Sequence, residues 1–308
     1  MHQSRAVFKL SDVFNHPLRN YRRFPGVYVI RNIMYDTRFG DSKNMLDIYL
    51  SPEKKKGKYP VIFNVHGGGF VGGGKKYRSG FARYFADKGW AVINVGYRLA
   101  PNFTFPSATE DCINALNFVN GLAEEHDLDL NKIVVTGDSA GGYYAAHTVA
   151  AVTNDTLRQS LNLPEYTGEK LRGFMGFYAP YDLLKCFTTP QLFDVTLDIT
   201  NCVFGTHFED LNFRDKLPFS DEQVNVVKNI TSNWPESFLI EAEKDAFCGN
   251  QAIIMGEALT NASIPHEIYI ASENTDSHCT HLYPFLRSTK KIYEKVDKFV
   301  DNIYFEKS

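Results

Sequence analysis

The sequence predicts an α/β fold with a mostly parallel, eight-stranded sheet that carries helices on both faces. Short apolar runs recur along the chain, and helix-length stretches separate most of them. Strands that alternate with helices of this length are typical of parallel sheets covered on both sides. The chain has 308 residues and 44% apolar content, enough to bury a full core, so we expect a single domain over residues 1–308.

The expected elements follow one another without an internal repeat. The eight strands are expected over 28–35, 45–50, 61–64, 90–95, 133–136, 173–178, 238–242 and 267–271. Helices are expected over 80–88, 109–125 and 142–153, between successive strands. The last stretch, 288–303, places Ile292, Val296, Phe299 and Ile303 on one helical face, as in a helix that packs on a core.

Residues 181–235 form an insertion of about 55 residues between two strands, longer than a single crossover helix requires. We expect this segment to form a helical lid together with residues 1–25, lining a substrate pocket. An ordinary helical layer with an aromatic core explains the composition equally well. The aromatic residues of the insertion are Phe187, Phe193, Phe204, Phe208, Phe213, Phe219 and Trp234.

Charge, apolar runs and cysteine content indicate which binding partners and which cellular compartment to expect. A net charge of −3 and a pI near 6.3 argue against nucleic acid, which favours basic proteins. The first residues lack the apolar segment of a signal peptide, and apolar runs are too short for a membrane span, so we expect no stable membrane insertion. Five scattered cysteines fit a reducing cytoplasm. A homodimer is left open.

The segment Gly137-Asp138-Ser139-Ala140-Gly141 carries the strongest functional signal. It lies between an apolar run and a helix-compatible stretch, and G-x-S-x-G in this context is the pattern of a nucleophile elbow. Small residues suit such a turn because the strand and the helix leave little room around it. A plain turn is the alternative, since Gly, Asp and Ser are all turn residues.

A glycine-rich loop follows the strand at 61–64. The run His66-Gly67-Gly68-Gly69-Phe70 exposes backbone N–H groups, which an acyl-transfer enzyme uses to stabilise an oxyanion. We expect the N–H groups of Gly68, Gly69 and Ala140 to form the oxyanion hole. His66 is expected to support the loop by hydrogen bonding rather than to act as a base.

The same glycines suggest nucleotide binding, which the neighbouring residues disfavour. A phosphate-binding loop would need Ser or Thr after Lys75, where the chain has Lys76. A dinucleotide fold would need an acid at the end of the next strand, but Asp87 precedes that strand. We therefore expect no cofactor.

An acid follows the strand at 238–242. Asp245 is the preferred member of a catalytic triad, because carboxyl ends of strands form the functional edge of an open α/β sheet. Glu243 and Glu241 are the weaker candidates. Asp245 is also suited to cap a helix over 251–259, which is the alternative interpretation.

The base is expected in the polar loop after the strand at 267–271. His278 is preferred and His281 is the alternative, because one imidazole must contact both Ser139 and Asp245. The grouping with Cys279 lacks the second Cys/His pair of a zinc site, so we expect no metal.

These motifs, with Tyr97-Arg-Leu-Ala-Pro101 and Phe105-Pro106 before Asp111, resemble the hormone-sensitive-lipase-like branch of α/β-hydrolase fold carboxylesterases and lipases. The resemblance spans roughly residues 45 to 300. It implies an α/β-hydrolase fold and hydrolysis of small or short-to-medium acyl esters through an acyl-serine intermediate. It also implies a triad of Ser139, Asp245 and a loop histidine, with a small-molecule ester as substrate.

Two other functions fit the same residues. An amidase or peptidase would use the same triad, and sequence alone does not separate it from an esterase. A non-catalytic hydrolase-fold binding protein would keep the scaffold without turnover, which usually shows as a missing triad member.

Overall fold

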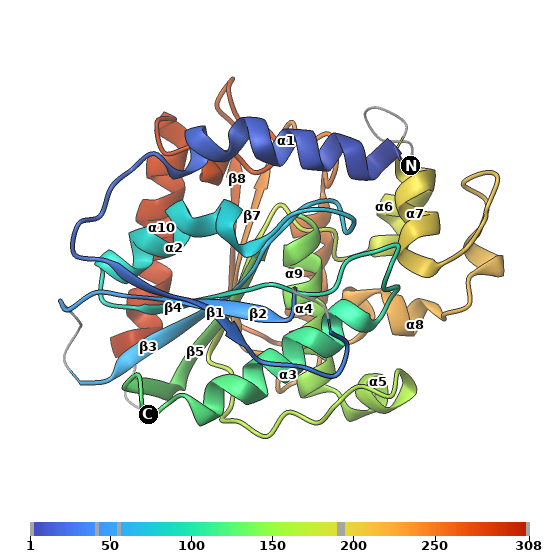
Figure 1. Cartoon of the computed structure of the whole chain (residues 1–308). Coiled ribbons are helices and arrows are strands. Elements are labelled where there is room, and N and C mark those ends of the chain that lie inside the picture. The colour runs from blue at the N-terminus through green and yellow to red at the C-terminus, as the bar shows by residue number, and fades with distance from the viewer. Residues whose placement is uncertain (1–2, 41–42, 54–56, 190–194, 306–308) are drawn as a thin grey trace.

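A computed structural model describes residues 3–40, 43–53, 57–189 and 195–305 (Figure 1). Its centre is an eight-stranded sheet in the order β1-β2-β4-β3-β5-β6-β7-β8. The first two strands pair in antiparallel fashion and β3 to β8 run parallel, so the predicted mostly parallel sheet is confirmed. The strands are β1 Tyr28–Met34, β2 Met45–Leu50, β3 Tyr59–Val65, β4 Ala91–Val95, β5 Leu128–Asp138, β6 Gly173–Phe177, β7 Glu236–Ala242 and β8 His266–Ala271.

Strand β5 is longer than the sequence predicts. It begins at Leu128, which pairs with Tyr59, and its register shifts between Pro60 and Val61 of β3. Asp129, Asn131 and Lys132 interrupt the apolar pattern in this irregular part of the strand, so the apolar run marks only the section from Ile133 onward. The extension lies at the amino end of β5, away from the elbow.

Helices cover both faces of the sheet, as predicted (Figure 1). On one face α3 Ser107–Gly121, α4 Ala140–Thr153 and α9 Gln251–Asn261 contribute to one buried apolar cluster. On the other face α2 Ser79–Asp87 and α10 Arg287–Phe305 contribute to a second cluster. The predicted helix 109–125 begins and ends a few residues earlier, and 142–153 begins at Ala140, directly after Ser139.

The expected lid segments contain several helices. These are α1 Gln3–Asn20, α6 Leu183–Thr188, α7 Thr196–Phe204 and α8 Asp221–Val224. Helix α1 crosses the molecule above the sheet and reaches α7, whose Asp198 accepts hydrogen bonds from Ser4 at 2.6 and 2.9 Å (Figure 1). Residues 1–2 and 190–194, with Phe193, lie outside the described residues.

The remaining short helices connect these layers. They are α5 Asp155–Ser160 and the 3-10 turns Lys75–Arg78, Arg214–Lys216, Val226–Lys228 and Thr280–Leu282. Among the helices in the described ranges, none combines the length and apolar character needed to cross a bilayer.

Candidate active site

Ser139 lies in the tight turn between β5 and α4. Its φ of 53° is strained for a residue with a side chain, so the surrounding packing must hold it. A Cβ at Gly137 would lie 2.3 Å from the Gly141 carbonyl oxygen, and one at Gly141 would lie 2.3 Å from the Val65 carbonyl oxygen. Both positions therefore require glycine, as expected of a nucleophile elbow.

His278 lies between Ser139 and Asp245. Its Nε2 is 2.8 Å from Ser139 Oγ, and its Nδ1 is 2.9 and 3.0 Å from the two Asp245 carboxylate oxygens. The same carboxylate accepts the backbone N–H groups of Phe247 and Cys248 at 2.8 and 3.0 Å. Since Nδ1–H donates to the carboxylate, Nε2 is left to accept the Ser139 proton. The structure thus brings together the three residues that the sequence predicts as nucleophile, base and acid.

Neighbouring charges and burial act in opposite directions on the pKa values of His278 and Asp245. Burial lowers the pKa of His278, but the adjacent Cys279 thiol and the Asp245 carboxylate raise it more, so the pKa lies well above the ordinary value of 6.5. Burial raises the pKa of Asp245, but His278 and the two backbone N–H donors lower it further, to a net decrease. The paired carboxylate therefore stabilises the imidazolium form of His278.

The alternative base, His281, and the weaker acid candidate Glu241 make other contacts than those of the triad. His281 is 2% exposed and stacks on Phe177, with ring centroids 4.3 Å apart, and burial lowers its pKa to about 3. Glu241 accepts the backbone N–H groups of Asn250 and Ala252 at the start of α9. The helix-capping alternative for Asp245 is wrong, because Asn250 is the N-cap residue of α9.

The glycine loop lies beside Ser139. Gly69, Ser139, Ala140 and His278 line one cavity of about 70 Å³. Gly68 has a φ of 147°, and its carbonyl oxygen accepts the Gly72 N–H at 2.9 Å, which closes the loop on itself. The sequence predicts that the Gly68 N–H joins those of Gly69 and Ala140 in the oxyanion hole.

His66 supports the glycine loop from below. Its ring Nδ1 is 3.0 Å from the Gly67 carbonyl oxygen and its ring stacks on Tyr97 at 4.4 Å between centroids. Burial lowers the pKa of His66 to about 3, so the ring is neutral at physiological pH. This agrees with the supporting role expected for it.

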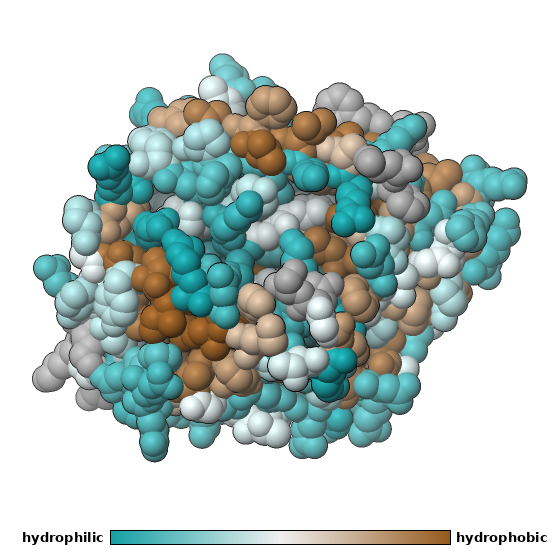
Figure 2. All heavy atoms as spheres, in the orientation of Figure 1, coloured by the Kyte–Doolittle hydropathy of each residue, from teal (hydrophilic) through white to brown (hydrophobic). Residues whose placement is uncertain are grey.

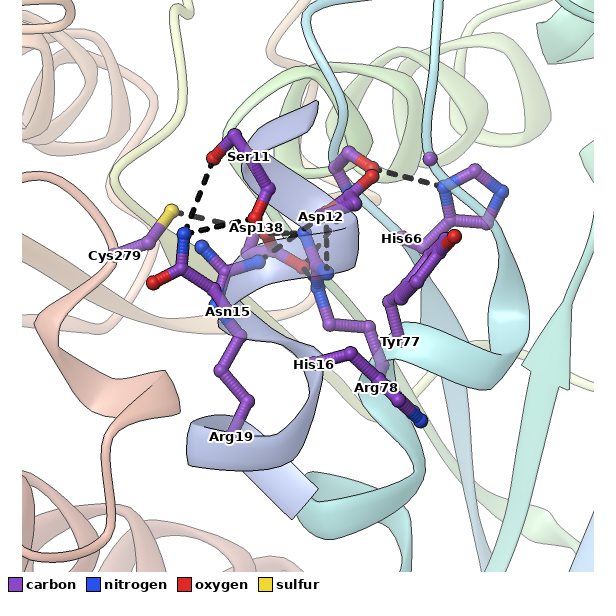
Figure 3. Close-up of polar contacts among 12 residues, drawn as sticks. Ser11, Asp12, Asn15, His16, Arg19, His66, Tyr77, Arg78, Asp138 and Cys279 are labelled. Atoms are coloured by element: carbon purple, nitrogen blue, oxygen red, sulfur yellow. Dashed lines mark hydrogen bonds and ion pairs between the residues drawn. The ribbon is translucent and has the colours of Figure 1, made fainter. Parts of the chain in front are cut away.

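A buried ion cluster lies beneath the elbow (Figure 3). The sequence did not predict it. Asp138 receives two hydrogen bonds of 2.6 Å from Arg78, and it accepts the Gly67 N–H at 3.2 Å. On α1, Asp12 lies 3.8 Å from Arg78 Nη1 and 3.2 Å from Arg19 Nη1. The two acids and two arginines balance in charge, and they connect the elbow, the glycine loop and α1.

The pocket wall comes from the expected lid segments. The Phe8 ring of α1 lies against Gly69 so closely that a Cβ there would fall 2.1 Å from it. Phe8 lines the cavity together with Phe187 of α6 and with Thr196 and Ile199 of α7. Aromatic and aliphatic side chains therefore surround the approach to Ser139.

Potential metal ligands in the described residues coincide with this site. The ligand atoms of Asp245, Cys248 and His278 lie within 4.8 Å of one another. Asp245 and His278 already satisfy each other by hydrogen bonding, and the third ligand is a buried thiol whose pKa is raised by Cys186 and by burial. A thiol with a raised pKa is a poor metal ligand, because metals bind the thiolate.

Comparisons with known proteins agree with this geometry. A family model described as BD-FAE matches residues 46–255, more than half of the chain. Esterase LipC of Mycobacterium tuberculosis is 28% identical over 220 residues, which cover 70% of this chain and 51% of LipC. An alpha/beta hydrolase of Acanthamoeba polyphaga mimivirus is 37% identical over 106 residues, which cover 34% of this chain and 31% of that protein. The chain thus spans about half or less of the length of these two relatives.

Solved structures match over nearly the whole chain. The crystal structure of Esterase B from Lactobacillus rhamnosis has a TM-score of 0.82 and 18% identity, covering 98% of this chain and 94% of that one. This similarity shows the fold, which is that of the α/β hydrolases. With the match to the family model, it follows that the chain belongs to the BD-FAE family of α/β hydrolases.

Proposed function

We propose that the protein is a serine carboxylic ester hydrolase that acts on small or short-to-medium acyl esters through an acyl-serine intermediate. The observation that carries the proposal is the continuous hydrogen-bonded chain from Ser139 Oγ through His278 to Asp245, at one side of an apolar cavity. The names of the relatives, among them esterases LipC and LipQ, support the same reaction.

The first half-reaction forms the acyl-serine. His278 Nε2 takes the Ser139 proton as Oγ attacks the ester carbonyl carbon, and the carbonyl electron pair moves to the oxygen. The N–H groups of Gly68, Gly69 and Ala140 stabilise that oxyanion. Collapse of the intermediate breaks the bond to the alcohol oxygen, which leaves with the proton from His278.

The second half-reaction releases the acid. Water gives a proton to His278 Nε2 and attacks the acyl carbon, and the same N–H groups stabilise the second oxyanion. The bond to Ser139 Oγ then breaks and His278 returns the proton to it. Asp245 stays ionised and steadies the imidazolium in both halves, consistent with its lowered pKa.

The acyl group is proposed to lie in the cavity between Ser139 and the lid segments 1–25 and 181–235. Its walls are largely apolar, with Phe8, Phe187 and Ile199 from the two segments. A volume of about 70 Å³ favours short acyl chains within the proposed range. Longer chains would require the aromatic side chains to move.

The test is hydrolysis of p-nitrophenyl esters from acetate to octanoate beside the p-nitroanilide of acetate. We expect release from the esters, fastest at the short end, and much slower release from the anilide. Faster cleavage of the anilide would identify an amidase. No release from any compound by folded protein would favour a non-catalytic binding protein.

A further inference from the structure

Helix α1 exposes its apolar side to solvent. Leu10, Val13, Phe14 and Leu18 are 57%, 54%, 74% and 48% exposed, and Val7 lies on the same side at 39%. Figure 2 shows hydrophobic side chains along the upper edge of the molecule, where Figure 1 places α1. We call these five residues the α1 apolar face.

Apart from Phe8, which packs against Gly69 and the core, the helix is attached through its polar side. Its buried residues are Ser4, which hydrogen-bonds to Asp198 of α7, and Asp12, which lies 3.8 Å from Arg78 Nη1. At its end, the Asn20 side chain accepts hydrogen bonds from the Gly80 N–H and the Ser79 hydroxyl, at 2.6 and 2.9 Å. A surface helix normally packs its apolar stripe on the core and leaves its polar side in water. The reversed orientation leaves the α1 apolar face available for another apolar phase.

Positive charge surrounds this face. Residues 3–23 contain five basic side chains and a single acid, although the whole chain has a net charge of −3. The acid is Asp12, which is buried and paired with Arg19. The exposed basic residues of this segment are Arg5, Lys9, Arg22 and Arg23.

The cationic character continues into a large groove beside α1. This groove, of about 740 Å³, runs along Gly72, Gly73 and Gly74. The two acids that line the groove form ion pairs. Asp12 pairs with Arg19, and Asp47 pairs with Lys75 and Arg31. The basic residues that line it are Arg5, Lys9, Arg31, Lys43, Lys75 and Lys76.

We propose that α1 docks the protein on an anionic lipid surface. The helix would lie in the plane of the headgroups with the α1 apolar face among the acyl chains, while the flanking basic residues meet the lipid phosphates. A helix with an apolar side, basic flanks and low mean hydropathy has the properties of an interfacial anchor. Docking of this kind is peripheral and needs no membrane-spanning segment.

Charge distinguishes a lipid surface from a second copy of the chain. Two copies joined through α1 would bring two basic segments together, and like charges across an interface oppose association. An anionic surface instead matches both the apolar face and its basic surroundings. The proposal is independent of ester hydrolysis, but Phe8 connects the two, because it belongs to α1 and lines the cavity with Ser139.

The test is co-sedimentation with vesicles of diether lipids, which an ester hydrolase does not cleave. We compare phosphatidylcholine vesicles with equimolar phosphatidylcholine–phosphatidylglycerol vesicles. Wild-type protein is expected to bind the anionic vesicles and to bind less as salt is raised. The double variant Leu10→Ser/Phe14→Ser is expected to lose about tenfold or more in affinity for the vesicles, because two exposed apolar side chains no longer enter the acyl region. Lys9→Gln/Arg23→Gln is expected to lose binding to anionic vesicles selectively.

Matched controls lie away from α1. Phe305, at the end of α10, is 71% exposed, close to the value for Phe14, and Lys170 is exposed before β6. Phe305→Ser and Lys170→Gln are expected to bind like wild type, and unchanged thermal unfolding midpoints would show that all variants are folded. Equal binding by the α1 variants and wild type, or no binding to either vesicle, would overturn the proposal. So would self-association that Phe14→Ser abolishes in protein that binds no vesicles.

Discussion

Asp138 and Arg78 form the most deeply buried ion pair near the elbow, with side chains 3% and 4% exposed. The positive charge of Arg78 keeps the pKa of Asp138 below its ordinary value despite burial, which raises it. The ionised form therefore stabilises the fold above the ordinary pKa of an aspartate. That stabilisation is lost as the pH falls through the lower, folded-state pKa.

Removing one partner should leave an uncompensated buried charge. Arg78→Met is expected to lower the free energy of unfolding by about 3–5 kcal/mol, measured by urea denaturation. Arg78→Met/Asp138→Asn should recover part of this loss. Arg158→Met breaks the pair with Asp155, whose side chain is 79% exposed, and should cost less than about 1 kcal/mol. A similarly small cost for Arg78→Met would contradict the account of the cluster.

The raised pKa of His278 predicts the pH dependence of turnover. A general base acts only when neutral, so activity should be full above this pKa and should fall as the pH drops through it. We expect the acidic limb of kcat/KM for p-nitrophenyl acetate to have its midpoint above 6.5, the ordinary value for histidine. The substrate does not ionise in this range, so the limb reports the enzyme. A midpoint below 6.5 would show that burial outweighs the carboxylate.

The two loop histidines should respond differently to substitution. His278→Asn is expected to lower kcat by about 10⁴-fold or more, because Ser139 loses its proposed base. His281→Asn should instead lower thermal stability, because its ring is packed against Phe177, and should leave most of the activity. Loss of activity only in His281→Asn would reverse the assignment of the base.

At the scale of elements, the lid segments set the shape of the proposed acyl pocket. Phe187 of α6 lines the cavity, whereas Phe219 packs on Phe105 and Phe204 outside it. Phe187→Ala is expected to shift the preferred p-nitrophenyl ester toward longer acyl chains, because the cavity deepens. Phe219→Ala is the matched control and should keep the wild-type profile. An unchanged profile in Phe187→Ala would remove this residue from the pocket.

Elements whose apolar pattern reports their own burial were predictable from sequence. All eight strands lie near their expected positions. The pattern is clearest in inner parallel strands such as β4 and β6, which are buried at every position and almost entirely apolar. Residues 1–25 were expected to contribute to a helical lid, but the bounds and orientation of α1 were not predicted, since its apolar residues face solvent and its attachment depends on distant polar partners. The link between Arg78 and Asp138 was hidden for a similar reason, because 60 residues separate them and neither carries a motif for the other.

At the scale of the molecule, the fold and the order of the site residues followed from motifs, whereas the distribution of charge did not. G-x-S-x-G and the glycine loop have fixed places on this fold, so the sequence alone assigns Ser139, Gly69 and Ala140 to one edge of the sheet. The basic surroundings of α1 arise only when segments 3–23 and 72–77 come together. The single domain and the cytoplasmic location stay predictions, and a homodimer stays open.

The role of Ser139 as the nucleophile is tested most directly by covalent labelling with a fluorophosphonate probe, read by intact mass and peptide mapping. The proposed mechanism predicts one adduct per chain, located on Ser139, and no adduct in Ser139→Ala. It also predicts much slower labelling in His278→Asn, since His278 activates the hydroxyl. Folded wild-type protein that remains unlabelled, or a Ser139→Ala variant that labels equally well, would contradict it.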